Sequence, residues 1–287
     1  KRNGYCCRTI FARDYLMYQK LSSFKPSGLL VFDIETIPDV VGLRRLYHWR
    51  DEFSDEEIIL WYQQKRRSEY GNEFAPIYLQ KVIAIACCFR WPDGSQEDIS
   101  IKNIGKTNDE EQNLLQCFFN IFEKYDLQLV SWNGNSFDLP VLQHRALIHG
   151  IEAPSYWELG EKKPEFKWNN YFSRYHLKHC DLMDVLSKHQ YSNRSPLDDM
   201  ARLCGLPGKL SISGQDVWQL YHRGDLAKIQ AYCETDVANT YLLFIRFQLN
   251  RGKVSRQRYE EETERLRDYL HQQKKPHWEE FLQAWGT

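Results

Sequence analysis

Two carboxylates lie two residues apart in a stretch of the sequence that is otherwise apolar. Asp33 and Glu35 interrupt the run from Leu29 to Ile37, which apart from these acids and Thr36 is typical of a buried strand. Successive side chains of a strand point to opposite faces, so both carboxylates are expected on one face of a sheet. Two negative charges ~4 Å apart repel by about 1 kcal/mol in water and by about 4 kcal/mol at an effective dielectric constant of 20. The pair therefore predicts a positive group between the acids, unless it only marks a strand end that faces solvent.

A second acid follows a turn between a predicted strand and a predicted helix. The strand ends before Asn133-Gly134-Asn135, and Asp138 stands at the mouth of the helix. Ligands of α/β proteins gather beyond the carboxyl ends of the strands, so Asp138 is expected to face the same crevice as Asp33. The alternative is that Asp138 only caps its helix.

A phenol and a carboxylate share one face of a third segment. Tyr232 and Asp236 are four residues apart in a long helical pattern, which places them one turn apart. Cys233, Val237 and Ile229 form the apolar stripe beside them. An ordinary Tyr–Asp contact on a helix surface has the same spacing. This segment therefore indicates a functional site only in combination with the segments that contain Asp33 and Asp138.

The predicted elements place the three segments in one α/β domain. Strands are expected over residues 29–37, 81–91, 98–103 and 127–132, and helices over 54–70, 107–122, 139–149, 195–204 and 225–244. Capping boxes at Ser54 with Glu57 and at Thr107 with Glu110 begin the first two helices. The turn Pro92-Asp93-Gly94 makes the second and third strands a hairpin. This order favours a mixed sheet whose first three strands form a meander.

The composition narrows the class of protein. The 287 residues are 42% hydrophobic, which is enough for a sizeable core. A net charge of −1 argues against a protein that coats nucleic acid through bulk charge, but not against a local basic groove. Apolar runs such as Val82 to Phe89 are shorter than the about 20 residues that span a bilayer. The eight cysteines contain no CxxC pair and are expected to be reduced thiols of a cytoplasmic protein. The charged run from Glu260 to Arg267 is expected to be a solvated helix face.

The three segments resemble, in order, the Exo I, II and III motifs of the DEDD 3′–5′ exonucleases. Asp33-Ile34-Glu35 is similar to Exo I, and Asn133 with three residues before Phe137-Asp138 is similar to Exo II. Tyr232 with three residues before Asp236 is similar to Exo III of the tyrosine subclass. The histidine subclass would need a histidine where Ala231 stands.

The likeness to one family extends beyond these motifs. Residues 179–184, 205–209 and 216–221 resemble the stand-alone, predicted PolB-like 3′–5′ exonuclease family. The resemblance covers residues 29–249 as an exonuclease domain and leaves 1–28 as an N-terminal extension and 250–287 as a charged C-terminal extension. It implies an α/β fold of the ribonuclease-H-like kind, with a mixed sheet (a three-strand antiparallel meander plus parallel strands) flanked by helices.

The resemblance also implies two divalent cations, Mg²⁺ or Mn²⁺, because carboxylates suit hard cations. Asp33 would bridge the two ions, Glu35 and Asp236 would complete the shell of the first, and Asp138 would hold the second. Tyr232 would orient the attacking water, since a phenol with a pKa near 10 is a poor base. The expected products are 5′-mononucleotides released from the 3′ ends of single-stranded or frayed DNA.

Contacts with nucleic acid are expected from residues beside the motifs and from an aromatic, basic loop over residues 151–175. The candidate side chains are Thr36, Ile37, Asn133, Phe137, Trp168 and Lys209. Aromatic rings stack on bases and basic groups neutralise phosphates, although most rings of the loop could equally pack beneath it. Two other functions stay open: an exoribonuclease of the same subclass, which differs in its treatment of the 2′-hydroxyl, and a catalytically silent nucleic-acid-binding module.

Overall fold

One mixed sheet forms the centre of the molecule in the computed structural model, which describes residues 28–92, 98–105, 109–210, 214 and 216–286. Its strands, in spatial order, are β3 (Ile99–Asn103), β2 (Gln80–Arg90), β1 (Gly28–Pro38), β4 (Leu127–Ser131) and β5 (His179–Asp181). β1, β2 and β3 pair antiparallel, whereas β4 runs parallel to both β1 and β5. This topology confirms the ribonuclease-H-like sheet, a meander continued by parallel strands.

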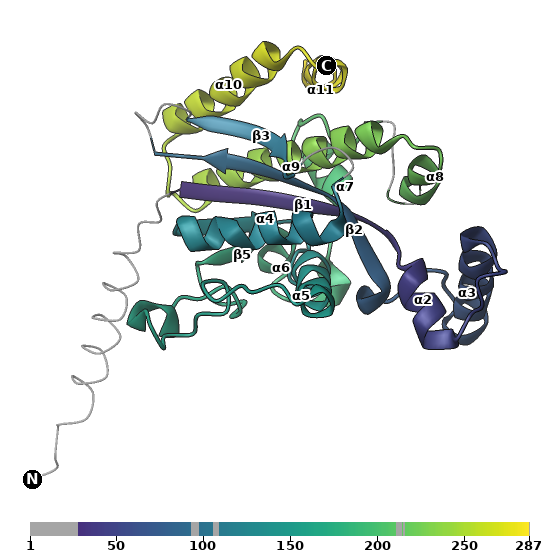
Figure 1. Ribbon diagram of the computed structural model, residues 1–287. Coiled ribbons are helices and arrows are strands. Elements are labelled where there is room, and N and C mark those ends of the chain that lie inside the picture. Colours follow the sequence, from purple (N-terminus) through teal and green to yellow (C-terminus); the bar gives the residue numbers. More distant parts are fainter. Residues whose placement is uncertain (1–27, 93–97, 106–108, 211–213, 215, 287) are drawn as a thin grey trace, which may run out of the picture.

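Helices cover both faces of the sheet (Figure 1). They are α2 (Val40–Tyr47), α3 (Asp55–Tyr70), α4 (Glu111–Lys124), α5 (Asp138–His149), α6 (Leu182–Leu186), α7 (Leu197–Leu203), α8 (Val217–His222), α9 (Leu226–Asn250), α10 (Arg256–Gln273) and α11 (Pro276–Trp285), with short 3₁₀ turns η1 (Ile77–Leu79), η2 (Pro164–Lys167) and η3 (Tyr191–Asn193). α4 and α5 pack on one face, and the long helix α9 packs on the other.

Alternation along β1 decides which side chains meet which helix. Phe32 and Ile34 join the core beneath α4, where Phe118 lies 5.3 Å from Phe32 between ring centroids. Val31 belongs to the opposite core, together with Val237 of α9. Because side chains alternate, the two acids of β1 fall on the α9 face, as the sequence pattern predicted.

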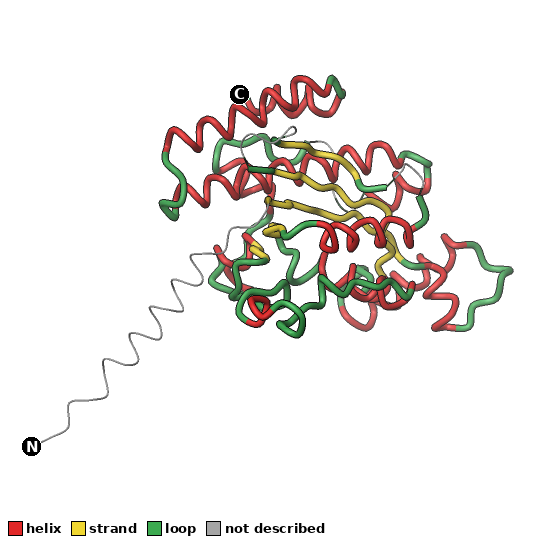
Figure 2. Tube along the Cα trace, turned by 60° about the vertical axis from the view of Figure 1, so that its left-hand side comes forward, coloured by secondary structure: helices red, strands yellow, loops and turns green. Residues whose placement is uncertain are grey.

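An inserted pair of helices, α2 and α3, separates β1 from β2 and projects beyond the end of the sheet (Figure 2). The capping box predicted for α3 is confirmed: the Ser54 side chain accepts from the Glu57 backbone, and the Glu57 side chain accepts from the Ser54 backbone. The capping box predicted for α4 is wrong, because that helix begins at Glu111 with Glu110 as its N-cap. Thr107, its other member, and the turn residues Asp93 and Gly94 lie outside the described residues.

The C-terminal helices α10 and α11 share a hydrophobic core with α9, to which they contribute residues such as Leu266 and Trp278. The prediction of a solvated face is wrong for Glu262, which is 7% exposed. Its carboxylate accepts from Arg90 of β2 at 2.7 Å and from the Tyr241 hydroxyl at 2.7 Å. Arg258, one turn earlier on α10, lies 2.7 Å from the same carboxylate. Burial of a charge requires such partners, and Arg90 and Tyr241 are ones that the helical pattern alone does not reveal.

The aromatic segment over residues 151–175 is divided between core and surface. The rings of Tyr156, Phe166 and Tyr171 are buried in the core beneath α4, whereas Trp168 and Tyr175 are exposed. Packing beneath the loop, the alternative to contact with nucleic acid, therefore holds for Tyr156, Phe166 and Tyr171 but not for Trp168 and Tyr175.

Candidate active site

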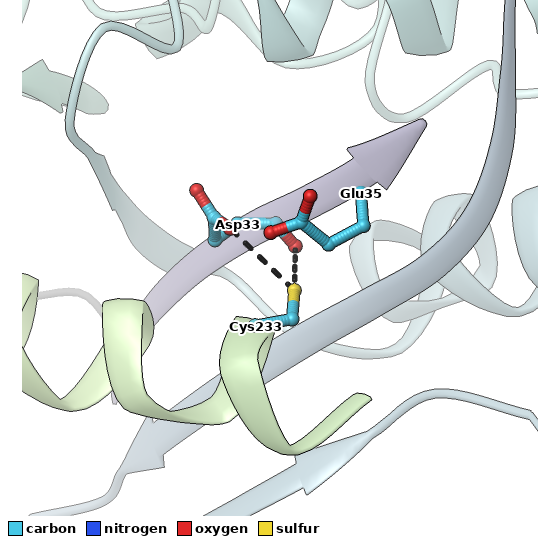
Figure 3. A group of neighbouring side chains, drawn as sticks. All are labelled: Asp33, Glu35 and Cys233. Atoms are coloured by element: carbon cyan, nitrogen blue, oxygen red, sulfur yellow. Dashed lines mark hydrogen bonds between the residues drawn. The ribbon is translucent and has the colours of Figure 1, made fainter. Parts of the chain in front are cut away.

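Asp33 and Glu35 project from the central strand toward α9 (Figure 3). Glu35 is 7% exposed, and a register shift follows it in the pairing of β1 with β2. Burial, together with the neighbouring acids, raises the pKa of both carboxyls well above the ordinary value. For Asp33 these neighbours are Asp138 and Asp236, so residues far apart in the sequence form one acidic cluster.

Asp138 is hydrogen-bonded to β1 at Ile34, the residue between Asp33 and Glu35. It is the first residue of α5, and its Oδ1 accepts from the backbone N–H of Ile34 at 3.3 Å. The N-cap of the helix is Phe137, so Asp138 does not serve as the cap. Burial raises the pKa of Asp138 to about 7. The structure thus places this acid beside Asp33, as the sequence pattern predicted.

The turn that leads to Asp138 is shaped by an acid on β5. Asp181 accepts the backbone N–H of Asn133 at 3.0 Å and that of Asn135 at 2.8 Å. Asn133 has φ 69°, and a Cβ at Gly134 would lie 2.2 Å from Ser131 Oγ. No positioning role was predicted for Asp181, although it lies in a segment that carries the family resemblance.

α9 contributes the third group of side chains. Tyr232 and Asp236 are 5% and 4% exposed, and Lys209 lies between them: its ammonium is 3.0 Å from Asp236 Oδ2 and donates to the Tyr232 hydroxyl. The charge of Lys209 offsets part of the rise in the pKa of Asp33 and Glu35 that burial and the neighbouring acids cause. Lys209 is therefore the positive group that the acid pair required.

The phenol of Tyr232 stays protonated in this setting. Burial raises its pKa far above 10, and the charges of Asp236, Glu35 and Asp33 raise it further. A phenol in this state donates a hydrogen bond and does not accept a proton from water. The site thus fits a role for Tyr232 in orientation rather than in general base catalysis.

Cys233 is a member of the site that the sequence pattern assigned to the apolar stripe. Its thiol donates to the Asp33 carbonyl oxygen at 3.4 Å and to Asp33 Oδ2 at 3.5 Å (Figure 3). Ligand atoms of Asp33, Glu35 and Cys233 all lie within 4.8 Å of one another. Burial raises the pKa of the thiol well above its usual range, so Cys233 is a neutral donor. The one sequence signal for it was its position next to Tyr232.

The donor set fits hard divalent cations. The four carboxylates offer oxygen atoms of the kind that such cations prefer, and the acids raise one another's pKa even with Lys209 beside them. Asp236 Oδ1 is buried without a hydrogen-bond partner, although buried polar atoms are normally satisfied. A bound cation would satisfy this oxygen.

A cleft of about 880 Å³ opens beside Glu35. Three of the residues predicted to contact nucleic acid line it, namely Thr36, Asn133 and Phe137. Ile37 is 4% exposed and packs in the core with Val217, and Trp168 is 61% exposed at the end of η2. Neither of these two is among the described residues that line the cleft. The structure brings Lys209 to the acids themselves.

Divalent cations are expected to stabilise the protein more at pH 8 than at pH 5.5. The pKa of Asp138 is about 7 in the folded protein, against an ordinary 3.8. Between pH 5.5 and pH 8, acids with such a raised pKa therefore bind more protons in the folded than in the unfolded chain. The free energy of unfolding of the metal-free protein therefore falls as pH rises through this window. Cations replace the protons, and at ten times its Kd Mg²⁺ should raise Tm by about 3–6 °C at pH 8.

Thermal unfolding with Mg²⁺ or EDTA at the two pH values measures this difference. Asp33→Asn should remove most of the Mg²⁺ effect, since it removes the acid at the centre of the cluster. An equal rise in Tm at both pH values would contradict the assignment of these acids as cation ligands.

Fold and site together define a class of protein: an α/β enzyme of ribonuclease-H-like fold whose acids converge between the central strand and a late helix. The chain belongs to the family described as predicted 3′–5′ exonucleases related to the exonuclease domain of PolB, whose model matches residues 72–285. The match includes Asp138, Tyr232 and Asp236, whereas Asp33 and Glu35 precede it.

Two polymerases are similar to parts of the chain. A DNA polymerase of Archaeoglobus fulgidus is 24% identical over 172 residues, which are 54% of this chain and 21% of the polymerase. The structure of the family B DNA polymerase from Pyrobaculum calidifontis matches with a TM-score of 0.47 and 17% identity, over 78% of this chain and 26% of that one. The chain therefore spans about a fifth to a quarter of the length of these relatives. No helix among the residues that the structure describes could cross a membrane.

Proposed function

We propose that this 3′–5′ exonuclease uses two divalent cations, Mg²⁺ or Mn²⁺, to release 5′-mononucleotides from the 3′ ends of single-stranded or frayed DNA. The observation that carries the proposal is the gathering of four acids around the middle of β1: Asp33 and Glu35 share one face, and Asp138 accepts from the Ile34 backbone between them. Asp236 lies beside Tyr232 through their shared contact with Lys209. The similarity to a DNA polymerase favours DNA over RNA as the substrate. The free state of the six cysteines among the described residues is consistent with a cytoplasmic protein.

Each side chain has a part in this proposal. Asp33, Glu35 and Asp236 would hold one cation and Asp138, with Asp33, the other; the bound cations would supply charge stabilisation for the phosphoryl group and activation of water. Tyr232, protonated and buried, would donate a hydrogen bond that orients the water. Lys209, which contacts both Tyr232 and Asp236, is close enough to the acids to reach a phosphate oxygen.

Labelled oligonucleotides test the proposal. We expect a 3′ label on single-stranded DNA to appear at once as mononucleotide in Mg²⁺ or Mn²⁺, while a 5′ label stays on a shortening ladder. EDTA should abolish both changes. The same pair of labels on RNA measures the preference for DNA.

Three results would overturn the proposal in different ways. Cleavage at internal positions would exclude an exonuclease, and equal rates in EDTA would exclude the metal. Tight, salt-sensitive binding without any product would identify a silent binding module.

A further inference from the structure

An exposed phenylalanine stands at the cleft on the side of the inserted helices. Phe74 belongs to residues 71–76, which connect α3 to η1, and it is 59% exposed. It lines the cleft that Glu35 also lines. Its ring lies 5.9 Å from that of Phe137 between centroids, at an interplanar angle of 49°, and Phe137 directly precedes Asp138. An aromatic pair thus borders the space next to the acidic cluster.

The backbone of Phe74 is fixed by hydrogen bonds. Its N–H donates to Asn72 Oδ1 at 3.1 Å, and its carbonyl oxygen accepts from Arg66 Nε at 3.1 Å. The Arg66 side chain also stacks over Tyr70, with its guanidinium carbon 4.1 Å from the ring centroid. The exposed ring is therefore carried on an ordered segment, which lowers the entropy cost of a contact with a ligand.

The same segment is attached to the strand that carries the acids. Gln80, which is 3% exposed, donates through Nε2 to the carbonyl oxygen of Ala75 at 2.7 Å. Its Oε1 accepts from the Thr36 hydroxyl at 2.9 Å, and Thr36 directly follows Glu35 on β1. Two hydrogen bonds thus set the position of the Phe74 segment relative to the acidic cluster.

We propose that Phe74 stacks on a base within the last two nucleotides of the substrate strand, an inference that rests on the proposed function. A strand whose terminal phosphodiester lies at the acids has its last bases within reach of the cleft beside Glu35. Single exposed apolar side chains are common on proteins, but this ring is carried on a hydrogen-bonded backbone, borders the cleft and has a second ring beside it. Stacking on a ring suits any unpaired base, since every base has a π-face.

A double-mutant cycle between Phe74 and the substrate bases tests the proposal. The substrates are one single-stranded DNA and two versions of it, abasic at the 3′-terminal or at the penultimate position. With the wild-type protein, we expect kcat/KM for release of the first nucleotide to fall about fivefold or more when the stacked base is absent. In Phe74→Ala, kcat/KM on the intact strand should fall by a similar factor, and loss of that base should have little further effect.

Three further variants separate stacking from simple packing. Phe74→Trp should retain the wild-type dependence on the base, whereas Phe74→Leu, apolar but not aromatic, should lose it. Tyr78→Ala removes a ring that is 51% exposed in η1 and is not among the described residues lining the cleft, so it should behave as the wild type.

Two results would overturn the stacking role. One is a Phe74→Ala protein whose kcat/KM on the intact strand equals that of the wild type. The other is a Phe74→Ala protein whose kcat/KM falls further at each abasic position by the same factor as that of the wild type. Absence of metal-dependent mononucleotide release by the wild-type protein would instead refute the proposed function itself.

Discussion

Alanine at Asp33 or Asp236 is expected to lower metal-dependent release of mononucleotides at least about 10³-fold. Asp33 lies at the centre of the cluster, where burial, Asp138 and Asp236 raise its pKa, and Asp236 carries a buried carboxylate oxygen without a partner. Loss of a ligand that positions a cation removes several kcal/mol of transition-state stabilisation, and each 1.36 kcal/mol is a factor of ten in rate. Release of a 3′-terminal label from single-stranded DNA in Mg²⁺ measures the effect.

The fold should survive both substitutions. A carboxyl whose pKa is raised by burial is less stable as an anion in the folded than in the unfolded chain, so its removal does not lower the free energy of unfolding at pH 8 through charge. Thermal unfolding in EDTA should therefore show little change in Tm. Asp225→Ala replaces a partly exposed acid at the N-cap of α9, the helix that carries Asp236; it is the matched control and should retain activity. Full activity of a purified, folded Asp33→Ala protein would disprove the site.

Replacement of Arg145 by methionine is expected to cost about 3–5 kcal/mol of stability. The Arg145 side chain is 4% exposed on α5 and forms ion pairs with Asp39, before α2, and with Glu111, at the start of α4. Glu111 also accepts the backbone N–H of Val82 at 2.7 Å. Removal of one member of a buried ion pair leaves an uncompensated charge, which is the reason for the large cost. At about 2–4 °C per kcal/mol, Tm should fall by roughly 10 °C.

Two comparisons make the Arg145 prediction specific. Addition of Asp39→Asn and Glu111→Gln to Arg145→Met should recover part of the lost stability, because the unpaired charges are then absent. Lys228→Ala breaks an ion pair whose lysine is 63% exposed and should change stability by less than about 1 kcal/mol. A change in Tm for Arg145→Met as small as that for Lys228→Ala would show that the buried network does not stabilise the fold.

Much of the fold followed from local patterns in the sequence. Alternation in β1 put Asp33 and Glu35 on one face, and the capping box at Ser54 began α3 where predicted. Both patterns depend on residues within one or two turns or pleats of each other, so they are visible without the rest of the chain. The ends of elements were less well predicted: α7 begins at Leu197 with Pro196, rather than Ser195, as its N-cap.

The sequence predicted that the acids and Tyr232 lie near one another, whereas several contacts of the neighbouring side chains were not predicted. Lys209 was expected to contact a phosphate, and the structure places its ammonium against Tyr232 and Asp236. Cys233 was expected to pack in an apolar stripe, and its thiol donates to Asp33. Cys233 does pack in the core beside Val237, and the phosphate contact of Lys209 stays a prediction; what the sequence could not supply is the additional partner that each side chain meets.

By itself, the sequence determined the first four strands, the main helices and the side chains that could bind cations, because periodicity and motif spacing are local properties. The three-residue strand β5 and the short helices α2 and α6 were not predicted, because they are too short to show a period. Only the tertiary structure decided which charges are buried together. Arg145 meets Glu111 and Asp39, Arg90 meets Glu262, and Phe74 meets Phe137 across separations that no periodicity records. A buried charge must find a partner wherever packing places one, so burial, rather than distance along the chain, selects these contacts.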